Sequence, residues 1–257
     1  MEGRTGMVNQ RKDISLVIPV KDEEANVEFL ALEIEKVFED SSREWECIWV
    51  DDGSTDATRN KLRAICQAES HHRFISLEEN AGQSAALFAG FRESLGNVIA
   101  TIDGDGQNDP ADIPALAEAV LSGECDMANG YRANRKDSLW KKFCSRIGNG
   151  VRNYVTGIKI RDVGCSTRAF RRECVIFFPA FKGMHRFIPT IAGIQGFVLR
   201  EYPVNHRPRR AGTSKYTALN RAFVGFLDCL GIRWLKNRNF RYRVSKISGN
   251  DQRCEND

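Results

Sequence analysis

The sequence predicts an α/β protein built on a mainly parallel sheet. Short β-rich runs begin at intervals of 25 to 32 residues in the first half of the 257-residue chain, and helical patterns fill the intervals. Parallel strands need a crossover of a dozen or more residues, usually a helix, so this spacing is typical of β-α units. The composition, 42% hydrophobic and 28% charged, is that of an ordinary folded protein and excludes disordered, collagen-like and disulfide-scaffold classes.

Five strands and four helices are expected to alternate up to residue 130. The predicted strands are residues 14–20, 46–52, 73–77, 98–103 and 125–130, each a short run rich in apolar or β-branched side chains. The predicted helices are residues 23–39, 56–69, 82–94 and 110–122. Asp109 and Pro110 open the last of these as a capping residue followed by a first-turn proline.

Beyond residue 130 the pattern changes to basic helical segments. Helices are expected at 137–156, 164–175 and 185–194, a strand at 197–204, and an amphipathic basic helix over 217–243. Residues 1–13 and 244–257 are expected to form a flexible N-terminus and a frayed tail.

The formal net charge of +4 hides two halves of opposite sign. Residues 1–128 contain 11 Lys and Arg against 26 Asp and Glu, a net charge of −15, whereas residues 129–257 contain 27 against 8, a net charge of +19. An acidic half favours a metal cation, and a basic half favours phosphates, an anionic membrane surface or nucleic acid. Solvated helix faces are the alternative explanation.

No segment has the length and apolar character of a membrane span. Residues 1–13 also lack the apolar stretch of a secretory signal, so we expect a cytoplasmic protein. The eight cysteines form no C-x-x-C pair, which favours buried thiols over a disulfide framework or a zinc site.

Acidic residues follow three of the predicted strands. The first strand ends in PVKDEE (19–24), the second in DDGSTD (51–56) and the fourth in DGDGQ (103–107). Ligands of parallel α/β sheets bind beyond the carboxyl ends of the strands, so these turns are expected to converge on one binding edge. Clustered carboxylates need a cation or hydrogen-bond donors among them, and Mg²⁺ and Mn²⁺ prefer oxygen ligands of this kind.

The D-x-D-x-Q turn is the best candidate for a metal site. A spacing of two along an extended segment places Asp103, Asp105 and Gln107 on one side. Neither an EF-hand calcium loop nor a glycine-rich phosphate loop fits, because the residues that those loops require are missing. A turn or a helix cap is the alternative role for Asp51, Asp56 and Asp109.

Six segments, taken in order, resemble family 2 glycosyltransferases. They are VIPVKDEE, VDDGSTDAT, ENAGQSAALFAG, TIDGDGQNDP, DVGCSTRAF and RPRRAGTSKY, and they lie within residues 14–216. The resemblance is closest to the polyprenyl-phosphate branch that contains dolichol-phosphate mannosyltransferase. It implies a GT-A-type, Rossmann-like domain over 14–216, with residues 14–130 as the nucleotide-sugar half and residues 131–216 as a basic, largely helical acceptor half.

The resemblance also implies where the donor lies. Asp103, Asp105 and Gln107 would hold a divalent cation, Mg²⁺ or Mn²⁺, that bridges the donor diphosphate, and Asp105 would thereby serve catalysis. The GQ pair in ENAGQ favours a UDP-sugar over GDP-mannose. The residues implied in donor binding are Pro19, Val20, Glu23, Asp51, Asp52, Ser54, Gly82, Gln83 and Asp103.

The basic half would bind the phosphate of a polyprenyl-phosphate acceptor. The implied residues are Arg132, Lys141, Lys142, Ser145, Arg209, Ser214 and Lys215, and an exposed, solvated base is the alternative for any single one. Asp162 matches an aspartate near the reaction centre, and a helix cap is its alternative. A lipid monophosphate, with a second pKa of about 6, is largely dianionic at neutral pH and hardly needs a general base. We therefore assign Asp162 to positioning first.

Many members of the branch continue into transmembrane helices, which this sequence does not contain, so we expect the enzyme to meet its acceptor in another way. Leu219, Phe223, Phe226, Leu227, Leu230 and Leu235 can share one apolar face beside a strongly basic end. That pattern is typical of an interfacial helix on a membrane, while packing on the protein's own core or binding to an integral membrane partner are the alternatives. The sequence leaves room for an oligomer.

The resulting prediction is a metal-dependent, inverting transfer of a sugar to a polyprenyl phosphate, by an enzyme peripherally associated with the cytoplasmic face of the membrane. Transfer to a hydroxyl acceptor is one alternative, and it would make Asp162 indispensable as a base. A non-catalytic module that binds anionic lipid or nucleic acid is the other, although no nucleic-acid partner is expected. Such a module would have no use for Asp103, Asp105 and Gln107.

Overall fold

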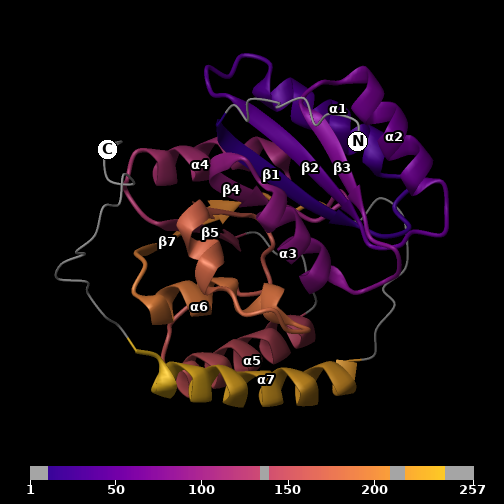
Figure 1. Ribbon diagram of the computed structural model, residues 1–257. Helices are drawn as coiled ribbons and strands as arrows, with labels where there is room; N and C mark the ends of the chain where they lie inside the picture. The colour runs from indigo at the N-terminus through magenta and orange to yellow at the C-terminus, as the bar shows by residue number, and fades with distance from the viewer. Residues whose placement is uncertain (1–10, 134–138, 209–217, 241–257) are drawn as a thin grey trace, which may run out of the picture.

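The computed structural model describes residues 11–133, 139–208 and 218–240, and the side chains of residues 139–147 and 218–223 are not among the described ones. Within these ranges lies a seven-stranded sheet with the strand order β3-β2-β1-β4-β6-β5-β7 (Figure 1). The strands are β1 (Lys12–Val20), β2 (Trp45–Asp51), β3 (His72–Ser76), β4 (Gly96–Thr101), β5 (Met127–Arg132), β6 (Arg168–Arg171) and β7 (Leu199–Val204). The helices are α1 (Val27–Phe38), α2 (Thr58–Ala68), α3 (Gln83–Glu93), α4 (Ile113–Leu121), α5 (Leu139–Thr156), α6 (Ile188–Gln195) and α7 (Ala218–Arg238). Three short 3₁₀ turns join them, η1 (Pro110–Asp112), η2 (Arg172–Phe177) and η3 (Met184–Arg186).

The predicted β-α alternation of the first half is confirmed. β1 pairs in parallel with β2 and with β4, and β2 pairs in parallel with β3. Leu16, Val17 and Ile18 in β1 are fully buried, as expected of a central strand that is covered on both faces. The predicted mainly parallel sheet is therefore present, and only the ends of its elements differ by a few residues from those expected.

The helix predicted over 164–175 is wrong, because part of this segment forms β6. β6 pairs antiparallel with β4 on one side and with β5 on the other. Its Phe170 is fully buried, opposite Ile99 in β4 and Met127 in β5. Backbone hydrogen bonds on both sides and the burial of Phe170 override the weak helical pattern of a short basic segment.

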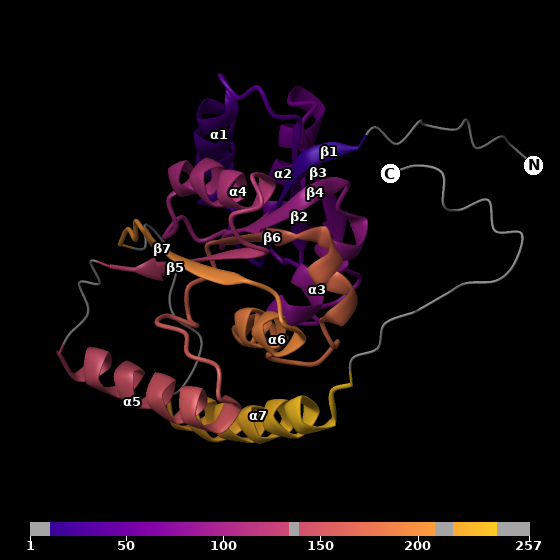
Figure 2. The ribbon, with the colours of Figure 1, turned by 90° about the vertical axis from the view of Figure 1, so that its left-hand side faces the viewer.

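Helices cover both faces of the sheet in layers. α1, α2 and α4 lie on one face, and α3 and α6 lie on the other (Figure 2). Each face has its own apolar core, with Trp49 and Leu30 in the first and Phe91, Phe170 and Phe187 in the second. The carboxyl ends of β1, β2 and β4 are left free for the turns that follow them.

α5 and α7 pack against each other on the side of the molecule farthest from α1 and α4 (Figures 1 and 2). α7 buries Cys229 and Ile232 in the second core and exposes Leu230 and Trp234. Among the described residues, no helix combines the length and the apolar character that crossing a membrane requires.

Candidate active site

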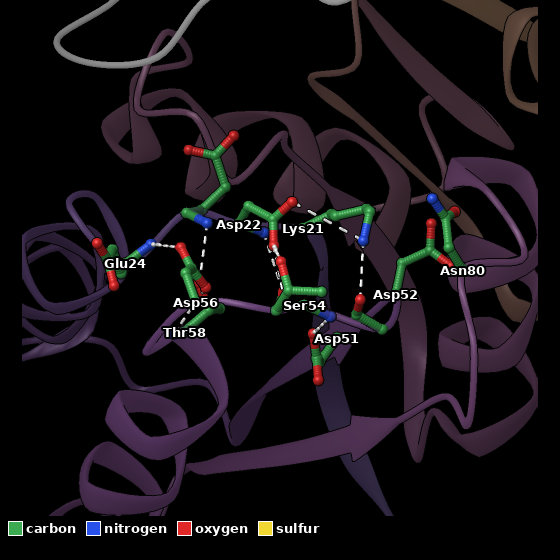
Figure 3. A network of polar contacts seen from close by, with 12 residues as sticks. Lys21, Asp22, Glu24, Asp51, Asp52, Ser54, Asp56, Thr58 and Asn80 are labelled. Carbon is green, nitrogen blue, oxygen red and sulfur yellow. Dashed lines mark hydrogen bonds and ion pairs between the residues drawn. The ribbon is translucent and has the colours of Figure 1, made fainter.

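The turns after β1 and β2 are hydrogen-bonded to each other (Figure 3). The amide of Asp22 donates to Ser54 Oγ at 3.0 Å, and the amide of Thr55 donates back to Asp22 Oδ1 at 2.8 Å. The amide of Glu23 donates to Thr58 Oγ1 at 2.8 Å. Asp22 has a φ of +54°, a left-handed conformation that aspartate tolerates better than most residues because its side chain can bond locally. The first two acidic turns therefore form one unit.

Asp51 is the buried centre of that unit. Its carboxylate accepts hydrogen bonds from the Ser54 amide at 2.9 Å, from Arg59 Nε at 2.8 Å and from Ser76 Oγ at 2.9 Å. Burial raises the pKa of Asp51, but the hydrogen bonds from Ser54, Arg59 and Ser76 outweigh burial, and the pKa lies below its ordinary value. Asp51 thus holds the turn as a carboxylate, and its predicted contact with a nucleotide stays a prediction.

Asp52 connects the second turn to the start of α3. Its Oδ1 accepts from the amide of Ala81 at 2.8 Å and from the amide of Gly82 at 3.0 Å. Gln83, the next residue, donates from Nε2 to Asp103 Oδ1 at 2.8 Å. Three of the predicted donor-binding residues and the first predicted metal ligand are therefore linked through one chain of contacts.

The turn after β4 approaches the end of β1. A Cβ at Gly104 would lie 2.5 Å from Val20 Cγ1 and 3.1 Å from the carbonyl oxygen of Pro19, so this turn can come so close only because the residue is glycine. Glu23 lies just beyond, and its carboxylate accepts from Asn26 Nδ2 at 2.6 Å. All three acidic turns meet at one edge of the sheet, together with the start of α3.

Two further aspartates make the capping hydrogen bonds that were weighed for them. Asp56 Oδ1 accepts from the amide of Thr58 at 2.9 Å, at the start of α2. Asp109 Oδ1 accepts from the amide of Ala111 at 3.1 Å, with Pro110 in the first turn of η1, as the sequence predicted. These bonds satisfy amides that the first turn of a helix leaves open.

Asp103 and Asp105 are two carboxylates close enough for their charges to repel each other. Burial and the nearby charge of Asp105 raise the pKa of Asp103 above its ordinary value. Asp105 Oδ1 accepts from the amide of Gln107 at 3.1 Å, and Asn108 Oδ1 accepts from the amide of Asp103 at 3.0 Å. In the described ranges, no three His, Cys, Asp or Glu side chains are grouped so that they could hold a metal ion by themselves.

Arg132 and Asp162, which the sequence placed in separate roles, form a bidentate ion pair. Arg132 Nε lies 2.7 Å from Asp162 Oδ2, and a terminal nitrogen of the guanidinium lies 2.8 Å from Oδ1. The two side chains are only 14% and 11% exposed, so the pair is largely shielded from water. Gly164 stands beside it, and a Cβ there would lie 3.0 Å from the Arg132 guanidinium.

A cavity of about 240 Å³ opens beside the D-x-D-x-Q turn. It lies between α3, the end of β4, the segment leading into β6, η3 and the start of α6. Its lining includes Gln83, Asp103, Gly164, Arg168 and Arg186. The cavity therefore has a carboxylate among its walls together with two arginines.

Arg168 and Arg186 were missed by the sequence analysis, as was His185, which also lines the cavity. Arg168 lies in the DVGCSTRAF segment that carried the resemblance, but the expected helix gave no reason to place it at the site. In a strand over the same residues, successive side chains point to opposite faces of the sheet. Arg168 would then lie on the opposite face from Ala169 and on the same face as Phe170. For Arg186 we find no signal in the sequence beyond its position in the basic half of the chain.

The remaining acceptor residues lie outside what the structure describes. Arg207, however, which begins the RPRRAGTSKY segment, donates its amide to the carbonyl oxygen of Gln107 at 2.8 Å and pairs with Glu33 at 2.8 Å and Asp109 at 2.9 Å. Arg207, the residue before Pro208, is thus attached to the D-x-D-x-Q turn. The side chains of Lys141, Lys142 and Ser145, and the whole of Arg209, Ser214 and Lys215, are outside the described residues.

Comparison with known proteins gives consistent matches. The sequence pattern described as "Glycosyl transferase family 2" matches residues 15–177. A dodecaprenyl-phosphate galacturonate synthase of Rhizobium johnstonii is 38% identical over 227 residues, which cover 87% of this chain and 67% of that protein. An undecaprenyl-phosphate 4-deoxy-4-formamido-L-arabinose transferase of Pectobacterium carotovorum subsp. carotovorum is 37% identical over 246 residues, or 95% of this chain and 75% of that protein.

Solved structures share the fold. Glucosyl-3-phosphoglycerate synthase from Mycobacterium tuberculosis in complex with Mg²⁺ and UDP has a TM-score of 0.66 at 18% identity, over 86% of this chain and 80% of that chain. The same enzyme with Mn²⁺ and UDP-glucose has a TM-score of 0.64, over 88% and 79%. The expected GT-A-type fold is confirmed.

Proposed function

The chain belongs to glycosyl transferase family 2, and from this premise we propose that it transfers a sugar from a nucleotide diphosphate sugar to a polyprenyl phosphate. Two relatives at 38% and 37% identity are named as transferases of that kind. The observation that carries the proposal is the cavity in which the Asp103 carboxylate and the Arg168 and Arg186 guanidiniums share one lining. Such a lining suits a phosphate group held next to a cation and a donor diphosphate at Asp103.

Asp103, Asp105 and Gln107 would hold a divalent cation, Mg²⁺ or Mn²⁺. They offer only oxygen ligands, and a cation would relieve the repulsion by which Asp105 raises the pKa of Asp103. Mg²⁺ is usually bound by one or two carboxylates together with substrate phosphates, so a third acidic side chain is not required. When bound, the cation would stabilise negative charge on the departing nucleotide diphosphate.

We propose a uridine nucleotide as the donor. The support is the GQ pair of Gly82 and Gln83 at the start of α3, joined to the second acidic turn by Asp52 and to the fourth strand's turn by Asp103. The Mycobacterium tuberculosis synthase, which shares the fold, was solved with UDP-glucose. Carboxylates and backbone groups at this edge can accept hydrogen bonds from a base and from ribose hydroxyl groups.

Arg132 would bind the acceptor phosphate, and Asp162 would position Arg132. Both carboxylate oxygens of Asp162 accept hydrogen bonds from Arg132, so the pair fixes the plane of the guanidinium. A phosphate monoester is itself the nucleophile and is largely dianionic at neutral pH, with a second pKa of about 6, so no side chain has to remove a proton. A hydroxyl acceptor would instead need a base.

The protein would meet its lipid substrate as a peripheral protein on the cytoplasmic face of the membrane. Phe226, Leu227, Leu230 and Trp234 on α7 are 44–63% exposed, and they recur at helical spacing opposite the buried Cys229 and Ile232. Arg233 and Arg238 are exposed on the same helix. An apolar face flanked by basic side chains fits an anionic bilayer surface.

Calorimetry with the intact protein tests the proposal. Uridine diphosphate sugars, including those carrying galacturonate and 4-deoxy-4-formamido-L-arabinose, are compared with GDP-mannose, each with and without Mn²⁺. We expect metal-dependent binding of a UDP-sugar, followed by transfer of its sugar to undecaprenyl phosphate. Folded protein that binds no nucleotide sugar in the presence of Mn²⁺ would contradict the proposal, and tight binding of GDP-mannose alone would contradict the choice of base.

A further inference from the structure

We propose that Arg168 anchors a phosphate-binding subsite in the cavity beside Asp103, and that this subsite binds the phosphate of the acceptor together with Arg132. The inference rests on the proposed function for the identity of the ligand. The subsite itself rests on the burial and bonding of Arg168.

Arg168 is a buried cation that has no carboxylate partner among the described residues. The residue is 3% exposed, and its guanidinium donates to the backbone carbonyl of His185 at 3.1 Å and to that of Cys165. Its Nε is buried and has no hydrogen-bond partner within the part of the chain that the structure describes. A buried charge is costly unless an opposite charge compensates it, and a neutral carbonyl does this only in part.

Two other arginines near the site, Arg132 and Arg207, already have carboxylate partners. Arg132 is paired with Asp162 at 2.7 Å, and Arg207 is paired with Glu33 and Asp109. No carboxylate of the described residues lies within ion-pairing distance of Arg168. Burial lowers the pKa of Arg168, and Asp103 and Asp162 offset this only partly, through longer-range charge interactions. An anion in the cavity would supply the partner that Arg168 does not find in the described part of the chain.

The cavity has the size and the second cation that a phosphate group needs. Arg186 lines it together with Arg168, and so does Gly164, which lies beside the Arg132 guanidinium. About 240 Å³ is less than the roughly 300–1,000 Å³ of pockets that enclose a drug-sized ligand. The space therefore suits a phosphate head group whose chain stays outside, and it is too small for a whole nucleotide sugar.

Asp103, which lines the same cavity, indicates which substrate the subsite binds. If the cation and the donor diphosphate sit at Asp103, as proposed above, a phosphate at Arg168 would lie next to them, because both residues line the same cavity. That is where an acceptor must stand to attack a sugar carried by the diphosphate. We therefore assign the subsite to the acceptor and not to the donor.

The test compares four intact proteins: wild type, Arg168→Gln, Arg168→Lys, and Arg171→Gln as the matched control. Arg171 is on the same strand, is 46% exposed in its side chain and pairs with Asp126 away from the cavity. For each protein, the KM for a short-chain polyprenyl phosphate and the Kd for UDP with Mn²⁺ are measured. We expect Arg168→Gln to raise the acceptor KM at least tenfold and to change the Kd for UDP less than twofold. The acceptor KM of Arg168→Lys should lie between those of wild type and Arg168→Gln, and Arg171→Gln should match wild type.

A shift of the donor Kd as large as that of the acceptor KM would assign Arg168 to the donor diphosphate and overturn the proposal. If Arg168→Gln does not fold, Arg186→Gln replaces it, with an expected rise of at least threefold in the acceptor KM. An unchanged acceptor KM in a folded variant also overturns the proposal.

Direct binding separates this inference from the proposed function. Phosphorus NMR of phenyl phosphate follows the line width of the free ligand with each protein. We expect broadening by wild type and by Arg171→Gln, and its loss in Arg168→Gln, even if no sugar is ever transferred to a polyprenyl phosphate. Equal broadening by wild type and Arg168→Gln would refute the subsite, whatever the enzyme's acceptor proves to be.

Discussion

The ion pair of Arg132 and Asp162 allows a decision between positioning and base catalysis. Asp162→Asn keeps the shape of the side chain and one acceptor oxygen but removes the charge and one of the two charge-assisted hydrogen bonds to Arg132. If Asp162 acts through Arg132, the loss falls on binding of the acceptor phosphate. If Asp162 removes a proton from a hydroxyl acceptor, the loss falls on turnover.

The structure sets the size of the effect. The two side chains are 14% and 11% exposed, so solvent screens the pair little. A hydrogen bond to a charged group contributes about 1.5–3 kcal/mol, and each 1.4 kcal/mol corresponds to a tenfold change in affinity. We therefore expect Asp162→Asn to raise the acceptor KM by about 10- to 100-fold and to leave kcat within a few-fold of wild type.

A double-mutant cycle with Arg132→Gln makes the test sharp. The double variant should have the same acceptor KM as Arg132→Gln alone, because Asp162 has nothing left to position. Asp126→Asn, which breaks the exposed pair with Arg171, is the matched control and should match wild type. Positioning would be refuted if Asp162→Asn lowers kcat by about 10²- to 10⁴-fold, changes the pH profile, and adds its effect to that of Arg132→Gln in the double variant. That result would favour a hydroxyl acceptor.

Three further outcomes follow from the structure. Asp105→Ala should abolish metal-dependent transfer while circular dichroism shows a folded protein; full activity of this variant in excess chelator would contradict the metal site. Burial, with the nearby charge of a second histidine, lowers the pKa of His72 from 6.5 to about 4. The contribution of neutral His72 to the free energy of unfolding is therefore complete above about pH 6.5, and it falls by about 3 kcal/mol as the pH drops toward 4. Denaturant titrations at several pH values should show this fall in the free energy of unfolding in wild type but not in His72→Asn. The same pH dependence in both proteins would contradict the prediction. Leu230→Glu combined with Trp234→Glu should reduce sedimentation with anionic vesicles while UDP binding stays unchanged, and undiminished sedimentation would count against α7 as the membrane-facing surface.

The sequence predicted the parallel part of the fold well because its signal is local. β1, β2, β4 and β5 are short runs of mostly buried residues, and helical intervals of regular length separate the strands from β1 to β5. The rule that ligands bind beyond the carboxyl ends of such strands then placed Asp51, Asp52 and Asp103 near one another. Their placement at one edge of the sheet followed from strand order alone.

The second half was harder because its contacts are not local. β6 is a strand only because β4 and β5 pair with both of its edges, and no pattern within residues 168–171 specifies those partners. The pairing of Arg132 with Asp162 joins residues 30 positions apart and depends on how the chain returns from α5 to β6. Arg168 was overlooked for the same reason, since its placement follows from the strand that the sequence analysis missed.

β6 also limits how members of this family can be recombined. It comes from the half of the chain assigned to the acceptor, yet it lies between β4, which leads to Asp103, and β5, which ends at Arg132. A chimaera joined at residue 130, with the donor half of one enzyme and the acceptor half of another, would place a foreign strand in the middle of the sheet. Ile99 and Met127 would then have to pack against a residue other than their own Phe170. Exchange of acceptor preference between relatives should therefore work only when β4, β5 and β6 are transplanted together.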